Sequence, residues 1–292
     1  MSSINDAVFL FDNYVDYATV SAQNQVTEMP ATNLQDPVRA TVWRGLSTYT
    51  SNYVDITLDD VHLVNYFAFV DHNLTSAGSI DIKGWTDAIN GSSLDVHFGF
   101  NPPVFRSAGA SNSVYGTGLY GDGPYGEAPL NVVPVGNTLI VKSSPTTQLS
   151  KYWRITFTDS SLNYIQCSRI IMSAGFHPST LNPNFGWTAK RTTRSDKEQS
   201  LGGQDWFTLR PSRLQLDLLY DEASDSEIAD FMNWAQYLDE TQPFFFALRP
   251  KDYTDISSIP SLMTQVYGTL QWNGTGMSFD RNRLSVTLTE SL

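Results

Sequence analysis

Three apolar segments between residues 53 and 85 give the clearest structural signal in the chain. Residues 53–58 alternate apolar and polar side chains, which is the period of a β-strand with one wet face. Residues 65–70 are apolar almost throughout, which is typical of a central strand covered on both faces. Residues 79–85 alternate again. Three consecutive strands with no helix between them predict an antiparallel sandwich or jelly roll.

The rest of the amino-terminal part carries further strand patterns. Residues 8–11 are apolar and are expected to start the first sheet, and residues 38–43 lead into the next strand. The remaining strands of the sandwich are predicted at residues 138–142, 152–157 and 168–172.

A long segment without apolar periodicity, residues 100–136, is predicted to be an insertion loop. Its Tyr-Gly pairs invite comparison with a phosphate-binding glycine loop, but neither a Lys-Ser/Thr ending nor a helix signal follows them. Tyr115, Tyr120 and Tyr125 place flat amphipathic rings on a glycine-rich backbone, a composition used for adaptable contact surfaces. The alternative, that these rings only pin the loop to its own domain, is equally open.

The pattern changes again after Pro178 and Pro183. The polar run at residues 188–199 predicts a linker or an edge region, since no apolar period continues through it. We therefore expect two domains, a sandwich at residues 1–178 and a smaller β-rich domain at residues 179–292.

The second domain is predicted to contain one amphipathic helix at about residues 224–240. Ser224 and Glu227 have the spacing of a capping box, in which each side chain satisfies the other's free backbone N–H. A stripe at helical spacing follows, formed by Ile228, Phe231, Met232, Ala235 and Leu238, and it is expected to pack on a neighbouring sheet. Strands are predicted at residues 213–219, 244–248, 265–271 and 283–289.

Composition narrows the range of partners. The formal net charge of -12 should repel phosphate backbones, so direct nucleic-acid binding is not expected. The single cysteine, Cys167, lies in a strand pattern and is interpreted as a small buried hydrophobe rather than a nucleophile. No signal peptide is evident, and no apolar run approaches the roughly 20 residues of a membrane span. Synthesis in a bacterial cytoplasm is expected.

No catalytic constellation emerges from the polar residues. The four histidines show no metal-ligand spacing, and no G-x-S-x-G elbow accompanies His72. A turn in which Asp71 and Asn73 bond their own backbone is the preferred interpretation of that segment. The acid pairs at 59–60 and 221–222 are expected to serve a turn and a helix start, respectively, rather than glycoside hydrolysis. Asp side chains and backbone carbonyls of the sandwich loops are suitable calcium ligands, but no EF-hand-like spacing supports a calcium site.

Several short motifs, taken in order, resemble the discoidin-like (galactose-binding-like) sandwich modules of bacteriophage tail and baseplate proteins. They are Ala-Thr-Asn-Leu at 31–34, Val-Trp-Arg at 42–44, the strand at 53–58 and Asp-His-Asn-Leu at 71–74. The element order of residues 185–292 is similar to the carboxy-terminal parts of phage distal-tail and minor tail proteins. The resemblance implies a virion structural protein with a galactose-binding-like sandwich.

These observations lead to a mainly β, noncatalytic virion protein without a cofactor, placed at a tail tip, in a baseplate or attached to a tail. Its expected partners are copies of itself and other tail proteins. The alternative is an adhesin that binds host surface glycans, since discoidin-like modules often bind sugars through loops at one end of the sandwich. The candidate residues for contact with a glycan or a partner are His72, Asn73, Trp85, Tyr115, Tyr120 and Tyr125.

Overall fold

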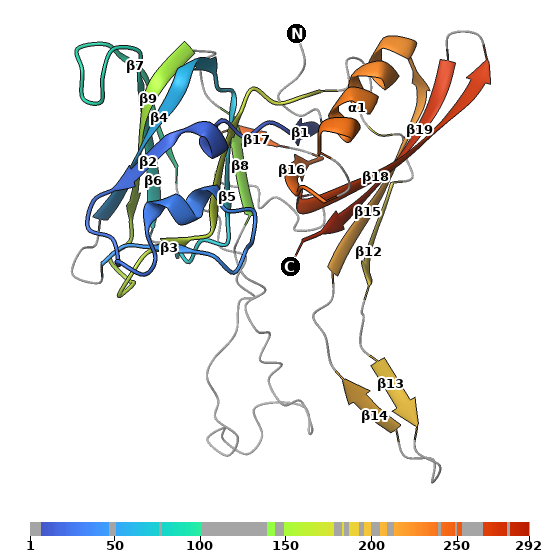
Figure 1. The fold of residues 1–292 in the computed structure, drawn as a ribbon, viewed down its shortest axis with the longest axis horizontal. Helices are drawn as coiled ribbons and strands as arrows, with labels where there is room; N and C mark the ends of the chain where they lie inside the picture. Colours follow the sequence, from blue (N-terminus) through green and yellow to red (C-terminus); the bar gives the residue numbers. More distant parts are fainter. Residues whose placement is uncertain are drawn as a thin grey trace, which may run out of the picture.

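The computed structural model describes residues 7–46, 51–75, 78–100, 139–143, 149–177, 183, 187–192, 196–199, 205–208, 213–238, 241–248, 250–252, 265–278 and 281–291. Most of these residues lie in β-strands, and they include one α-helix and two short 3-10 helices, η1 (Tyr14–Tyr17) and η2 (Ala31–Gln35). The predicted mainly β class is therefore confirmed (Figure 1). None of the described helices is long and apolar enough to cross a membrane.

An antiparallel sandwich forms the amino-terminal half. Its five-stranded sheet has the order β2 (Thr19–Ala22), β4 (Ser51–Leu63), β9 (Leu149–Thr158), β6 (Ser79–Trp85) and β7 (Leu94–Phe100). Its four-stranded sheet has the order β11 (Arg169–Ser173), β5 (Tyr66–Val70), β8 (Leu139–Ser143) and β17 (Lys251–Asp252). A small ladder joins β3 (Trp43–Arg44) to β10 (Gln166–Cys167).

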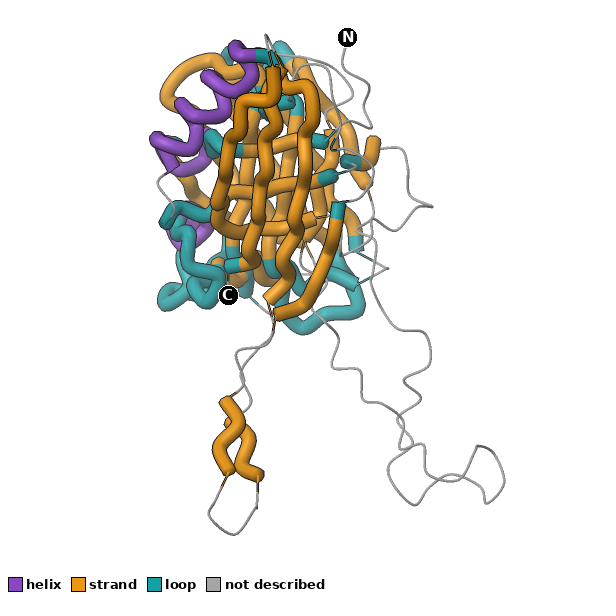
Figure 2. Tube along the Cα trace, turned by 90° about the vertical axis from the view of Figure 1, so that its right-hand side faces the viewer, coloured by secondary structure: helices purple, strands orange, loops and turns teal. Residues whose placement is uncertain are grey.

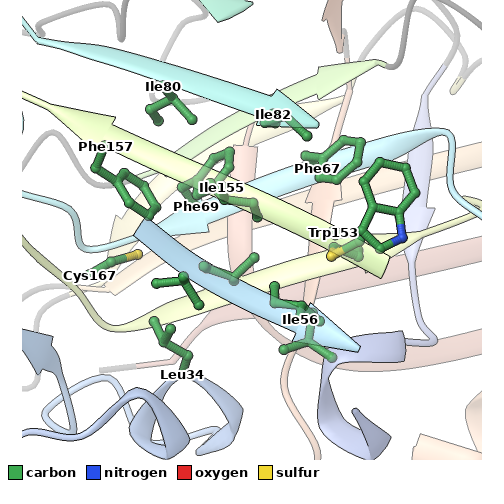
Figure 3. Close-up of a cluster of buried hydrophobic side chains, with 14 of the residues drawn as sticks. Leu34, Ile56, Phe67, Phe69, Ile80, Ile82, Trp153, Ile155, Phe157 and Cys167 are labelled. Atoms are coloured by element: carbon green, nitrogen blue, oxygen red, sulfur yellow. The ribbon is translucent and has the colours of Figure 1, made fainter. Parts of the chain in front are cut away.

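Alternating strands supply the sandwich core, as the sequence predicted. Phe67 and Phe69 of β5 meet Trp153 and Phe157 of β9, and the ring centroids lie 5.2 Å and 5.7 Å apart (Figure 3). Cys167 is buried in the same cluster and forms no disulfide, which confirms its interpretation as a small buried residue.

A six-stranded antiparallel sheet forms the second half. Its order is β1 (Val8–Leu10), β16 (Phe244–Ala247), β18 (Gln265–Ser278), β19 (Arg281–Glu290), β15 (Arg213–Ala223) and β12 (Thr188–Thr192). Helix α1 (Asp225–Leu238) packs on one face of this sheet, where alternate strand residues form a second core. The polar β12 occupies a sheet edge, so the predicted edge region is confirmed there.

The predicted cap of α1 is confirmed. The backbone N–H of Ser224 donates to the Glu227 carboxylate at 2.7 Å, and the backbone N–H of Glu227 donates to the Ser224 hydroxyl at 3.3 Å. Phe231 and Leu238 are buried in the second core, as expected. Met232 was wrongly assigned to the buried stripe, because it lies at the margin of that face and is 39% exposed.

The two halves exchange strands. Residues 8–11 were expected to start the first sheet, but β1 instead pairs with β16 at the edge of the six-stranded sheet. In return, β17 from the carboxy-terminal half pairs with β8 in a parallel ladder. Figure 1 shows these strands lying between the two halves. The predicted division at residue 178 therefore does not follow strand membership, and whether the halves separate remains a prediction.

A third cluster of buried apolar residues joins the halves. It contains Val8, Leu10, Tyr66, Ala68, Val70, Ile171, Phe245, Ala247 and Tyr267. Strand β5 is thus covered on one face by the sandwich core and on the other by this cluster, which explains why its sequence is apolar throughout.

A partly buried cluster of ion pairs also links the two halves. The guanidinium of Arg39 donates two hydrogen bonds of 2.6 Å to Asp71 and one of 3.0 Å to Glu290. It also donates to the backbone carbonyl of Ser291 at 2.8 Å. Because Asp71 is engaged by Arg39, the predicted turn in which its side chain bonds its own backbone is wrong.

Both acid pairs lie in strands, and only the second directly precedes a helix as predicted. Asp59 and Asp60 belong to β4, beside an irregularity in its pairing with β9, instead of forming a turn between strands. Asp221 belongs to β15 and accepts a hydrogen bond of 2.6 Å from Arg283 of β19. The insertion loop predicted at residues 100–136 lies outside the described residues, except for Phe100.

Candidate functional site

The candidate site is a cavity of about 280 Å³ between the two halves. The segment after β1 and helix η1 line one side of it, and η2 and β11 contribute further residues. The end of α1 and the turn into β16 complete the lining from the carboxy-terminal half.

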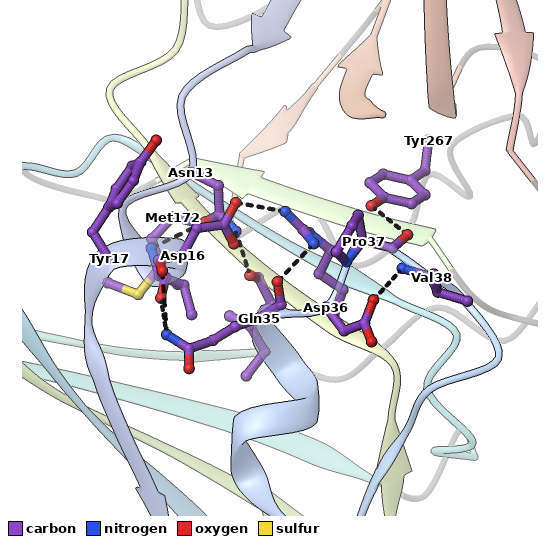
Figure 4. Close-up of polar contacts among 12 residues, drawn as sticks. Asn13, Asp16, Tyr17, Gln35, Asp36, Pro37, Val38, Met172 and Tyr267 are labelled. Atoms are coloured by element: carbon purple, nitrogen blue, oxygen red, sulfur yellow. Dashed lines mark hydrogen bonds and ion pairs between the residues drawn. The ribbon is translucent and has the colours of Figure 1, made fainter. Parts of the chain in front are cut away.

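A buried ion pair anchors the polar side of the cavity. Arg169 of β11 is only 5% exposed, and its Nη2 donates to the Asp16 carboxylate at 2.6 Å. Its Nη1 donates to the backbone carbonyl of Gln35 at 3.1 Å, while its buried Nε has no partner among the described residues. The side chain of Asn13 donates to Asp16 at 2.7 Å (Figure 4). This network fixes the position of the Asp16 carboxylate.

Asn13 in turn is held by the backbone of β11. Its amide oxygen accepts from the backbone N–H of Met172 at 3.0 Å, and its amide nitrogen donates to the carbonyl of Ile170 at 3.2 Å. The same oxygen caps η1 by accepting from Val15 at 3.3 Å. A buried amide with satisfied donors and acceptors gives the cavity wall a defined geometry.

Two carboxyl groups of the lining are harder to ionise than usual. Burial raises the pKa of Asp16 to about 6, against the opposing effect of Arg169. Burial also raises the pKa of Asp12, which His62 lowers and Asp59 raises further. Both groups accept hydrogen bonds when ionised, and a protonated carboxyl group can also donate one.

Two tyrosines from different halves meet at the solvent side of the cavity. The hydroxyl groups of Tyr17 and Tyr237 lie 2.5 Å apart, although the residues are 220 positions apart in sequence. Their exposed fractions are 62% and 52%, so flat ring surface remains open to solvent. The hydrogen bond to Tyr237 raises the pKa of Tyr17 to about 12.

Much of the remaining lining is apolar. It consists of Leu10, Phe11, Ile171, Pro37, Leu238, Pro243 and Phe244, while Gln35 and Gln242 add amide groups. Within the described residues, no group of three His, Cys, Asp or Glu side chains is placed to hold a metal ion. The amide nitrogen of Gln35 is already engaged, since it donates to the backbone carbonyls of Val15 at 2.7 Å and Ala18 at 2.9 Å. The lining therefore supplies carboxylate acceptors, the Gln242 amide and aromatic surface, which together suit a small ligand with both polar and apolar faces.

The structure does not bring the sequence-predicted contact residues to this cavity. His72 is buried, and neither ring nitrogen has a partner among the described residues. Trp85 is buried at the end of β6. Asn73 is partly exposed, but its side chain donates to the carbonyl of Tyr164 and accepts from the backbone N–H of Gln166, both at 2.9 Å. The side chain of Asn73 thus fastens a distant segment instead of its own turn.

The remaining predicted contacts, Tyr115, Tyr120 and Tyr125, lie outside the described residues. Sequence reasoning missed the cavity residues, since they come from four separated segments. A weak signal was present in Asp12, Asn13 and Asp16, which are polar residues directly after the apolar run of β1. Nothing local in the sequence indicates that Arg169 or Tyr237 lies beside them.

Comparison with known proteins gave similarity in structure alone. No protein-family model matches the chain, and no curated protein sequence matches it. A family 32 carbohydrate-binding module from C. perfringens NanJ, solved with galactose, is 11% identical with a TM-score of 0.37, covering 57% of this chain and 98% of that one.

Two further solved structures have similar scores. Chitosan-binding module 1 of a chitosanase/glucanase from Paenibacillus sp. IK-5 is 15% identical with a TM-score of 0.37, covering 55% of this chain and 98% of that one. The family 32 module of AlyQ, solved with 4,5-unsaturated mannuronic acid, is 17% identical with a TM-score of 0.33, and the match covers 53% of this chain and 92% of that one. Because identities and TM-scores are this low, the likenesses assign neither a site nor a ligand to this chain.

Proposed function

We propose that this chain is a noncatalytic binding protein that recognises a carbohydrate on a host cell surface. The observation that carries the proposal is the lining of the cavity between the halves. It brings Asp12, Asp16 and Gln242 together with Tyr17 and Tyr237, whose rings are exposed.

This combination matches the chemistry of a sugar. Sugar hydroxyl groups donate to carboxylates and exchange hydrogen bonds with amides, and those bonds fix the orientation of the ring. The apolar face of a sugar ring packs against aromatic side chains, which offer a flat surface with a polar tip. The buried Arg169 network supports the proposal because it holds Asp16 in place before any ligand arrives.

A glycan array probed with the full chain tests the proposal. Tyr237→Ala removes aromatic surface from the mouth of the cavity, and Trp272→Ala is its matched control, since Trp272 is also partly exposed but does not line the cavity. We expect wild type and Trp272→Ala to bind the same glycans, and Tyr237→Ala to lose at least roughly tenfold in affinity. Absence of glycan binding by wild type, or unchanged binding by Tyr237→Ala, would overturn the proposal.

A second candidate function is a structural role in a bacteriophage tail or baseplate, beside other tail proteins and further copies of this chain. The observation that favours it is the ladder of β13 (Asp196–Gln199) and β14 (Asp205–Thr208), which stands apart from both halves in two perpendicular views (Figures 1 and 2). An isolated two-stranded ladder is marginally stable in water at best. A partner chain that pairs with this ladder or packs against it would stabilise it.

Deletion of residues 196–208 tests this second candidate. The expected result is an unchanged melting temperature of the isolated chain together with loss of incorporation into assembled particles. Normal incorporation of the deletion variant would refute an assembly role for the ladder.

A further inference from the structure

We infer that the cavity between the halves accepts a single non-acidic sugar ring and rejects sugars that carry a carboxylate. The inference rests on the proposed carbohydrate-binding function and adds the class of ligand and the side chain that determines it. Two acidic side chains, Asp12 and Asp16, and one basic side chain, Arg169, line the cavity. The basic side chain is paired within the protein, whereas one of the two acidic side chains forms no ion pair among the described residues.

The only cation of the described lining is already engaged. Both terminal nitrogens of Arg169 donate hydrogen bonds, one to Asp16 at 2.6 Å and one to the carbonyl of Gln35 at 3.1 Å. The remaining nitrogen, Nε, is buried with almost no solvent contact and is not presented to an incoming anion. A ligand carboxylate would therefore lose its hydration without gaining a cation.

The charge of Asp12 also makes the site unfavourable for a ligand that carries a carboxylate. Asp12 belongs to the lining and takes part in none of the ion pairs found among the described residues, although His62 and Asp59 of β4 act on its charge in opposite senses. An ionised Asp12 beside an ionised ligand carboxylate is a like-charge contact in a partly desolvated place, where such repulsion is strongest. A neutral hydroxyl group, in contrast, donates to the same carboxylate without a charge penalty.

The size of the cavity limits the ligand to one ring. Its volume of about 280 Å³ lies just below the range of roughly 300 to 1,000 Å³ that is usual for small-molecule sites. Tyr17 and Tyr237 stand at the solvent side, where a second ring of a longer glycan would leave the cavity. We therefore expect the terminal sugar of a glycan to occupy it.

Calorimetric titration of the full chain with two matched pairs of methyl glycosides at pH 7.5 tests the inference. The pairs are galactoside with galacturonide and glucoside with glucuronide, which differ in ring size and shape hardly at all. Wild type should bind the preferred neutral glycoside at least about tenfold tighter than its acidic partner, or about 1.4 kcal/mol. Asp12→Asn should reduce the ratio of the affinity for the neutral glycoside to that for the acidic glycoside several-fold, because it keeps the shape of the side chain and removes its charge.

The control is Asp230→Asn, the same chemical change at an exposed position of α1 that does not line the cavity. It should leave the ratio unchanged, and thermal melts should show that both variants fold. Equal binding of neutral and acidic glycosides by wild type, or an unchanged ratio in Asp12→Asn, would overturn the inference. Binding on a glycan array without binding of any of the four methyl glycosides would refute the single-ring assignment. Absence of all glycan binding would instead refute the proposed function itself.

Discussion

Replacing Phe9 by Ala should weaken the carboxy-terminal half of the protein, although Phe9 lies near the amino terminus. Phe9 belongs to β1 and is fully buried in the core beneath α1. Its ring centroid lies 4.7 Å from that of Phe246, 5.2 Å from that of Phe11 and 5.5 Å from that of Phe231. The substitution therefore leaves a cavity where β1, β16 and α1 meet.

The expected loss follows from burial and ring contacts. Truncating a buried Phe to Ala costs about 3 to 5 kcal/mol, and the surrounding aromatic pairs keep the expected cost for Phe9 well inside that range. A loss of about 4 kcal/mol is a large fraction of the roughly 5 to 15 kcal/mol that stabilises a folded domain. At about 2 to 4 °C per kcal/mol, the melting temperature should fall by roughly 8 to 16 °C.

Urea unfolding measures the total loss, and amide hydrogen exchange locates it. Protection should fall first in β16 and β18 and be retained longer in β4 and β9. Phe157→Ala is the matched control, because Phe157 is equally buried but belongs to the sandwich core. In that variant amide protection should fall first in β4 and β9 and be retained longer in β16 and β18. A loss below about 1 kcal/mol, or greater exposure of β4 and β9 in Phe9→Ala, would refute the strand exchange.

Three further predictions follow from single side chains. Ser224→Ala removes the acceptor for the Glu227 backbone N–H, so urea unfolding should show a loss of about 1 kcal/mol, and an unchanged midpoint would contradict the cap. Burial lowers the pKa of His72 to about 4, against about 6.5 in the unfolded chain, so the unfolded state binds more protons between these values. The stability present above pH 6.5 should therefore fall by about 3 kcal/mol on going to pH 4, and the same fall in His72→Gln would refute this origin. Burial raises the pKa of the Cys167 thiol to about 12, so a thiol reagent at pH 8 should modify the folded protein only as fast as it unfolds, whereas rapid modification would show an accessible thiol.

The spacing of apolar residues along the chain predicted the strands most reliably. Residues 79–85 were predicted as a strand, and β6 has the same bounds. The apolar run at residues 65–70 predicted a strand covered on both faces, and β5 is covered by the sandwich on one face and by the second half on the other. The capping residues Ser224 and Glu227 likewise fixed the start of α1. In each of these segments the signal is local, because neighbouring residues make the structure.

The partner of a strand is not a local property. Residues 8–11 are apolar because Val8 and Leu10 face the cluster between the halves while Phe9 and Phe11 face the second core. Two-sided burial erases the alternation that indicates which sheet a strand joins. Pairing with β16, which lies more than 230 residues away, had no signal in the sequence.

The candidate site was missed for the same reason. His72, Asn73 and Trp85 were chosen because they flank a loop, but packing buries His72 and Trp85 and engages Asn73 in holding another segment. The cavity joins Asp16 to Arg169 across 153 positions and Tyr17 to Tyr237 across 220. Such a site depends on how the two halves pack, which no spacing within one segment records.

The most direct test of the account is a crystal structure of the full chain bound to the glycan that binds best on an array. We expect density for a terminal sugar ring in the cavity between the halves, with its hydroxyl groups within hydrogen-bond distance of Asp12 or Asp16 and one face against Tyr17 or Tyr237. Density for the sugar at the loops of the sandwich, with the cavity filled only by water, would contradict the assignment of the binding site.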